Sequence, residues 1–159
     1  MHKSAGKKLD RADRAIIDEL SGDARTTNLA LAERVSLSPA ACLRRVKQLE
    51  ENDVIRSYTT VINRKSLGLE VEAFVQISLE RQAPENVRHM HETISRMPEV
   101  RECYVMTGSI DYLLHIVTTS LDAFADLISK TVLMLPGVKD VRSSFVLKCT
   151  KREPGLYVV

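Results

Sequence analysis

The chain has 159 residues and a formal net charge of +2; 44% of its residues are apolar, 28% are charged and none is tryptophan. This composition is typical of a globular protein and excludes collagen-like, mucin-like and wholly disordered chains. No run approaches the ~18 consecutive apolar residues of a membrane helix, and the basic N-terminus lacks the apolar core of a signal peptide. We therefore expect a cytoplasmic protein with no membrane partner.

Both the charge and the hydrophobic periodicity change near residue 66. Residues 1–66 contain 13 Lys and Arg against 9 Asp and Glu, a net +4, whereas residues 67–159 carry a net −2. Apolar residues recur at helical spacing before residue 55 and alternate after residue 70. We predict a helical domain over 1–55, a strand and linker over 56–66 with the strand at 58–62, an α+β domain over 67–150, and a segment 151–159 that is either a tail or an exchanged strand.

Residues 28–50 carry the pattern of a helix-turn-helix. A short amphipathic helix precedes a tight turn at Ser36–Leu37. Ser38 is suited to cap the next helix, and Pro39 is suited to its first position, where a missing N–H costs nothing. Small and apolar residues then follow at i, i+4 and i+7, at Cys42, Val46 and Leu49. Helix, short turn and helix with this spacing predict a helix-turn-helix, in which Cys42 packs in the core.

The outward face of this second helix has residues suited to the major groove of DNA. Arg44 and Gln48, one turn apart, have the donor geometry for guanine and adenine edges. Helix N-termini and nearby hydroxyls are suited to phosphates. The predicted DNA-contacting residues are Thr26, Thr27, Asn28, Ser38, Pro39, Ala40, Ala41, Arg44, Arg45, Lys47 and Gln48. The alternative is a solvated basic face paired with Glu50 and Glu51.

The second half of the chain contains a weak internal repeat. The turns Met97-Pro-Glu-Val100 and Leu135-Pro-Gly-Val138 each follow a helical stretch and precede a strand, because proline ends a helix. The predicted order is a strand over 70–80, a helix over 84–96, strands over 101–107 and 110–118, a helix over 121–134 and a strand over 141–148. This β-α-β-β-α-β order predicts a ferredoxin-like fold. One uncovered sheet face predicts oligomerisation.

Four motifs occur in order: Asp10-x-x-Asp13-x-x-Ile16, Leu37-Ser-Pro-x-x-Cys42-x-x-Arg45-Val46-x-x-Leu49-Glu50, Gly108-x-x-Asp111-Tyr-Leu-Leu114 and Leu135-Pro-Gly-Val138. Together they resemble the Lrp/AsnC (feast/famine) transcriptional regulators over roughly residues 9–150. The resemblance implies a winged or simple helix-turn-helix domain joined to an effector-binding ferredoxin-like domain. It also implies homodimers that assemble into octamers or larger rings on double-stranded DNA, with an amino acid as effector.

The same resemblance implies an effector pocket near Gly108–Tyr112. Its lining residues would be Val105, Thr107, Gly108, Ser109, Asp111, Leu133 and Ser144. A glycine turn offers N–H groups to the carboxylate of an amino acid, and Asp111 offers an acceptor for its ammonium. The alternative is that Gly108–Ser109 is a hairpin turn and Asp111 a hydrogen-bonded turn residue. Members of the family often have an acidic residue at the position of Ser109 and glycine at that of Ser36.

We expect no enzymatic activity, no cofactor and no metal site. The three cysteines form no Cys-x-x-Cys pair, which suits a reducing compartment and argues against a zinc finger. His89 and His91 are two apart on a predicted helix and point to different faces, and His115 is expected to be satisfied or solvated. The alternative is an enzyme of the sirohaem decarboxylase type on the same fold, although such enzymes typically lack a clear basic recognition helix.

Overall fold

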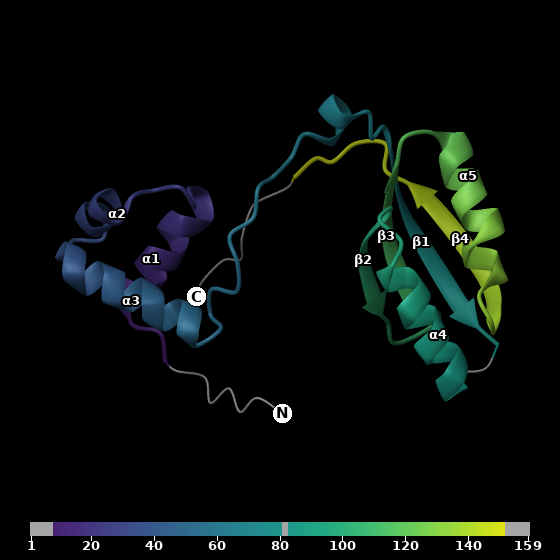
Figure 1. Ribbon diagram of the computed structural model, residues 1–159, viewed down its shortest axis with the longest axis horizontal. Coiled ribbons are helices and arrows are strands. Elements are labelled where there is room, and N and C mark those ends of the chain that lie inside the picture. Colours follow the sequence, from purple (N-terminus) through teal and green to yellow (C-terminus); the bar gives the residue numbers. More distant parts are fainter. Residues whose placement is uncertain (1–7, 81–82, 152–159) are drawn as a thin grey trace. The chain divides into compact units, whose positions relative to one another are not determined.

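A computed structural model describes residues 8–80 and 83–151 of the chain. These residues form two compact units, one comprising residues 8–61 with 150–151 and the other residues 62–149 (Figure 1). The change of unit between Val61 and Ile62 lies inside the segment 56–66 that the sequence marks as a linker. The tail predicted over 151–159 falls outside the described residues, except for Lys151.

The first unit consists of three helices, α1 (Arg11–Gly22), α2 (Asn28–Arg34) and α3 (Pro39–Glu51). Each begins at a residue whose side chain accepts a backbone N–H of the first turn, namely Asp10, Thr27 and Ser38. The Ser38 cap and the proline that follows it are those predicted from the sequence. Such caps satisfy donors that the helix leaves without a partner, so local sequence determines where each helix begins.

The turn between α2 and α3 is a left-handed C-cap. Ser36 has φ 57°, the Leu37 N–H donates to the Ala32 carbonyl at 2.9 Å, and the Ser36 N–H donates to the Glu33 carbonyl at 3.2 Å. This is the Schellman arrangement, in which glycine is usual. The helix-turn-helix therefore tolerates serine here at a modest backbone cost. Around the turn, the three helices enclose a core of Ile16, Leu31, Ala32, Cys42 and Leu49.

Two features of the linker segment depart from the prediction. Residues 56–63 form no strand, and within the described part of the chain nothing pairs with the β-forming residues Tyr58–Ile62. A high β-propensity yields a strand only where a neighbouring strand supplies the hydrogen bonds, so the strand predicted at 58–62 is wrong for the single chain. The linker ends instead in a 3₁₀ helix, η1 (Arg64–Leu67), which terminates at Gly68 with φ 71°.

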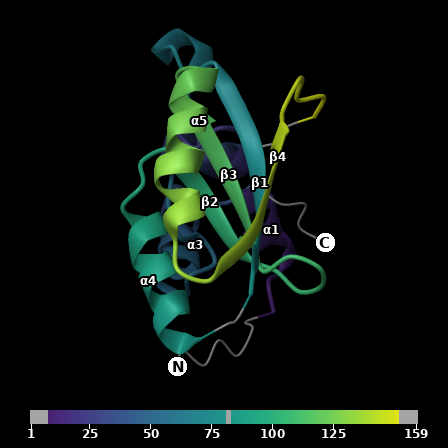
Figure 2. The ribbon, with the colours of Figure 1, turned by 90° about the vertical axis from the view of Figure 1, so that its right-hand side faces the viewer.

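The second unit has the predicted ferredoxin-like order. Its elements are β1 (Val71–Leu79), α4 (Pro84–Ser95), β2 (Val100–Val105), β3 (Tyr112–Thr118), α5 (Leu121–Lys130), the 3₁₀ helix η2 (Val132–Met134) and β4 (Val138–Phe145). The four strands form an antiparallel sheet in the order β2-β3-β1-β4. Both α4 and α5 pack on one face of this sheet (Figure 2), where they share a single core with β1 and β3.

Several element ends differ from those predicted. The helix expected to run to Met134 ends at Lys130 and continues as η2, which tightens the last turn before Pro136. The predicted strands 101–107 and 110–118 shorten and leave a loop of residues 106–111 between β2 and β3. Strand β4 begins at Val138, three residues before the predicted start, because Val138 pairs with Leu79 beyond a bulge at Lys139 of β4.

The sheet face without helices carries a partly buried polar cluster. Glu72 is nearly buried on β1; its carboxylate lies 2.8 Å from His115 Nε2 and 2.7 Å from Arg64 Nη2. The imidazole of His115 also stacks on the ring of Phe74 at 5.0 Å between ring centroids. His115 is therefore satisfied, as expected, and Arg64 attaches η1 to the sheet through Glu72.

Ile16 offers a direct test of the core of the first unit. Its side chain is fully buried, so Ile16→Ala should leave a cavity and lower the free energy of unfolding by about 2–5 kcal/mol. The matched control is Leu29→Ala on α2, where the leucine is 60% exposed and a change within about 0.5 kcal/mol is expected. Denaturant unfolding followed by helical circular dichroism measures both, and equal losses would contradict this core.

Candidate nucleic-acid interface and effector loop

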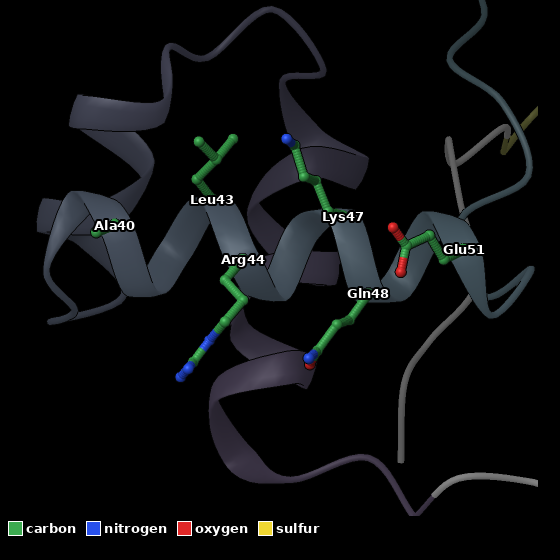
Figure 3. Close-up of a pocket in the computed structure, with 6 residues that line it drawn as sticks. All are labelled: Ala40, Leu43, Arg44, Lys47, Gln48 and Glu51. Atoms are coloured by element: carbon green, nitrogen blue, oxygen red, sulfur yellow. The ribbon is translucent and has the colours of Figure 1, made fainter.

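The outward face of α3 forms an open groove of about 430 Å³ (Figure 3). The residues that line it are Ala40, Leu43, Arg44, Lys47, Gln48 and Glu51. Four of these were predicted from the sequence to contact DNA, and Leu43 and Glu51 were not. Helical spacing could have identified them, because residues 40, 43, 47 and 51 recur every three or four positions and so share a face.

The groove has two chemically different sides. Leu43 and Lys47 point to one side of α3, and Arg44 and Gln48 point to the other (Figure 3). Arg44 is exposed and forms no ion pair or hydrogen bond with any other described residue. Ala40, in the first turn, adds little bulk and lets the start of the helix approach another surface closely. The geometry is that of a helix able to insert into the major groove.

Arg45 occupies a different environment from Arg44. Its Nη1 lies 2.7 Å from Asp10 Oδ2 and 2.7 Å from Asp13 Oδ1, so it ties α3 to the first turn of α1. The hydrogen bonds from Arg45 to Asp13 and Asp10 raise the pKa of the guanidinium, and the Asp13 N–H and then Arg45 lower the pKa of Asp10. This half-buried arginine therefore joins two helices of the domain through its ion pairs, and its predicted contact with DNA stays a prediction.

The residues predicted before α2 also have internal hydrogen bonds. Thr27 caps α2, and the Thr26 hydroxyl donates to Asp23 at 3.0 Å. The Asn28 Nδ2 donates to the carbonyl of Pro39 at 2.9 Å, so it joins the start of α2 to the first turn of α3. Ser38 acts as the cap of α3 and Ala41 is half-buried. These hydrogen bonds join the parts of the helix-turn-helix, and the phosphate contacts predicted for these residues stay predictions.

The loop predicted to bind an effector is fastened to the end of β1. The Asp111 N–H donates to the Ile77 carbonyl at 2.9 Å, and Asp111 Oδ2 accepts the Leu79 N–H at 2.7 Å. The Ser78 hydroxyl donates to the Ser109 carbonyl at 3.3 Å, and Gly108 adopts φ 109°, a conformation that favours glycine. Asp111 thus makes hydrogen bonds of the kind that the alternative interpretation expects, and its predicted contact with an effector stays a prediction.

The other predicted effector residues are spread over the second unit. Val105 at the end of β2 is 70% exposed, Thr107 is exposed in the loop, and Leu133 in η2 is half-exposed. Ser144 pairs across the sheet with Phe74, three to five residues before the Ile77 and Leu79 that hold the loop, a separation of about 10–16 Å along a strand. One chain therefore does not bring Ser144 to the loop at Gly108.

Two family models match the chain. The Lrp/AsnC ligand binding domain matches residues 72–156, and a winged helix-turn-helix DNA-binding domain matches residues 9–56. The chain belongs to the Lrp/AsnC family. The two matches coincide with the three-helix unit and with the unit built on the four-stranded sheet, and they make this family member a DNA-binding transcriptional regulator.

Named relatives in the Lrp/AsnC family are similar over nearly the whole chain. The leucine-responsive regulatory proteins of Klebsiella pneumoniae and Escherichia coli K12 are each 38% identical over 156 residues, covering 98% of this chain and 95% of theirs. A transcriptional regulator of Neisseria meningitidis, solved as its complex with L-Met, is 39% identical, with a TM-score of 0.90 over 94% of this chain and 96% of its own. An AsnC family regulator of Agrobacterium tumefaciens is 31% identical, with a TM-score of 0.87 over 94% and 97%.

The described residues show neither a metal-binding cluster nor a membrane-spanning helix. No group of three or more His, Cys, Asp or Glu side chains in residues 8–80 and 83–151 is placed to hold a metal ion. Over the same residues, no helix is both long and apolar enough to cross a membrane.

Arg45→Ala tests the structural ion pair. The substitution should lower the melting temperature, because it leaves the nearly buried Asp13 carboxylate without its partner. Asp10 has a lowered pKa when folded, so its stabilisation is present above its usual pKa of 3.8 and is lost as the pH falls through the folded value. The difference from the wild type, measured by thermal melts, should therefore be full at pH 7 and shrink below pH 3.8.

The neighbouring Arg44→Ala is the matched control for this experiment. Arg44 lies on the outward face without an internal partner among the described residues, so its removal should leave the melting temperature unchanged at both pH values. An equal decrease for the two arginine variants would contradict the structural role of the Arg45 ion pairs.

Proposed function

We propose that this Lrp/AsnC regulator binds specific DNA sequences through the groove on α3 and adjusts that binding when an amino acid occupies its C-terminal unit. The single observation that carries the proposal is the outward row of Arg44 and Gln48 on a capped helix whose neighbouring Arg45 is paired with Asp10 and Asp13. Arginine and glutamine donors one turn apart match the edges of guanine and adenine in the major groove. Lys47 on the other side of the groove supplies a phosphate contact.

Charge supports a multimer as the DNA-binding form. The N-terminal 66 residues carry a net +4, so each domain neutralises few phosphates and alone has a modest affinity for DNA. Several domains on one assembly raise the effective concentration and supply the remaining affinity. We propose homodimers that assemble into octamers or larger particles on double-stranded DNA, in agreement with the helix-free face of the sheet.

The proposed effector is an amino acid with an apolar side chain, of the leucine or methionine class. Support comes from two relatives: a leucine-responsive regulatory protein at 38% identity and a regulator solved with L-Met at 39%. Backbone N–H groups around Gly108 suit the carboxylate of such a ligand. A carboxylate accepts about four hydrogen bonds, so Asp111 can bind an ammonium while it also accepts the Leu79 N–H.

A second copy of the chain completes this proposed pocket. Since Ser144 lies about 10–16 Å along the sheet from the residues that hold the loop, we assign it, together with Leu133, to a pocket wall contributed by a neighbouring subunit. This arrangement would couple occupancy of the pocket to assembly, and hence to DNA affinity.

The contrast between Arg44 and Lys47 tests the DNA-binding proposal. With a promoter fragment from the protein's own upstream region, Arg44→Ala should lose about 1–3 kcal/mol of specific binding and little non-specific binding. Lys47→Ala should weaken all sequences evenly and reduce the salt dependence by about one phosphate contact. Fluorescence anisotropy at several salt concentrations measures both effects.

Two results would contradict this proposal. One is that the wild-type protein fails to bind the fragment at low salt. The other is a Soret shift when purified protein is mixed with sirohaem, which would favour the enzymatic alternative.

The effector proposal is tested by calorimetry of the twenty amino acids, with heat expected for leucine or methionine. Asp111→Asn is the informative variant, because its amide oxygen still accepts the Leu79 N–H while the charge is lost. It should weaken ligand binding roughly tenfold or more, the loss of one charged hydrogen bond.

Asp126→Asn on the exposed side of α5 is the matched control and should bind as the wild type does. Heat from no amino acid, or equal affinity in the Asp111 and Asp126 variants, would overturn the proposal. Asp111→Ala is less useful than the sequence alone suggests, since it removes a hydrogen bond that holds the end of β1.

A further inference from the structure

Leu43 is an apolar side chain on the face of α3 that carries the DNA-contacting groups. It is 46% exposed and lines the groove beside Ala40, Arg44 and Lys47 (Figure 3). It is absent from the buried core of the three-helix unit and from the residues packed against that core. Its side chain is therefore available to whatever enters the groove.

Exposure alone would carry no inference, because single leucines are common on protein surfaces. The position of Leu43 on the helix distinguishes it from other exposed leucines. Leu43 lies in the first half of a recognition helix, the part that meets base edges, and it directly precedes Arg44. A polar residue at that position would be expected if it only faced water or phosphate.

The chemistry of the major groove offers one apolar partner. Thymine has a C5-methyl group there, whereas guanine, adenine and cytosine present only donors and acceptors at their readable positions. A leucine side chain packed against the thymine methyl buries apolar surface of both groups. Leucine over a cytosine amino group or a guanine oxygen would instead cover a polar atom without giving it a hydrogen bond.

We propose that Leu43 recognises the methyl group of a thymine at one fixed position of each half-site, and that this thymine lies beside the base pair contacted by Arg44. The inference rests on the proposed DNA-binding function and names part of its sequence preference. Leu43 shares its side of the groove with Lys47, so the thymine belongs to the DNA strand whose phosphate Lys47 contacts. Arg44 and Gln48, on the other side, contact bases of the neighbouring pairs.

The test uses the full-length protein and a duplex that the wild type selects from a random library. Each thymine of the half-site is then replaced singly by deoxyuridine, which keeps the base pair and removes only the methyl. At the one thymine that Leu43 contacts, the wild type should bind the deoxyuridine duplex about fourfold more weakly than the thymine duplex for each methyl lost. The Leu43→Ala variant should bind the two duplexes equally. Wild type and Leu43→Ala with the two duplexes form a double-mutant cycle that isolates this contact.

Leu121→Ala is the matched control, because that leucine is 60% exposed on α5 in the other unit and should respond to deoxyuridine as the wild type does. Two results overturn the inference alone: a wild type indifferent to deoxyuridine at every position, or a Leu43→Ala variant that keeps the full sensitivity. A selection that enriches no sequence would instead overturn sequence-specific DNA binding, and this inference with it.

Discussion

The double ion pair of Arg45 sets the orientation of the recognition helix. One guanidinium lies 2.7 Å from the carboxylates of both Asp10 and Asp13, and those two residues also close the capping box at the start of α1. The start of α1 and the middle of α3 therefore hold each other. Successive helical residues are about 100° apart, so with Arg45 turned toward α1 the exposed Arg44 lies on the adjacent, outward side of α3. The buried Cys42 and Leu49 on the same helix enforce the same rotation. The side chains that α3 exposes for DNA therefore depend on this contact with α1.

The angle between the two helices of the motif depends on short polar contacts. The Schellman turn at Ser36 ends α2, the Ser38 hydroxyl caps α3, and the Asn28 amide reaches the Pro39 carbonyl at the start of α3. Most of the side chains predicted around the turn thus build the motif. The outward face of α3 is left to the groove residues, which form an apolar and cationic side with Leu43 and Lys47 and a hydrogen-bonding side with Arg44 and Gln48.

The sheet of the C-terminal unit has its apolar core on one face and a cluster of ion pairs on the other. Both helices pack on one face of the sheet, while the nearly buried Glu72 on the other is paired with His115 and Arg64. Breaking such a buried pair is costly, so Arg64 firmly attaches the end of the linker to β1. The loop at Gly108 is attached to the far end of the same strand through Asp111. Strand β1 therefore connects the linker to the loop proposed to bind the effector.

The sequence by itself determined the features that depend on neighbouring residues. These include the N-terminal helices, the cap at Ser38, the tight turn at Ser36–Leu37, and the strand and helix order of the second unit, because capping, periodicity and proline act locally. Only the tertiary structure decided the rest. Tyr58–Ile62 has the composition of a strand, yet a strand requires a partner strand, which local sequence does not supply. Helical spacing places Arg44 on the outward face and Arg45 on its flank, but only the packing of α1 against α3 brings the carboxylates of Asp10 and Asp13 to Arg45.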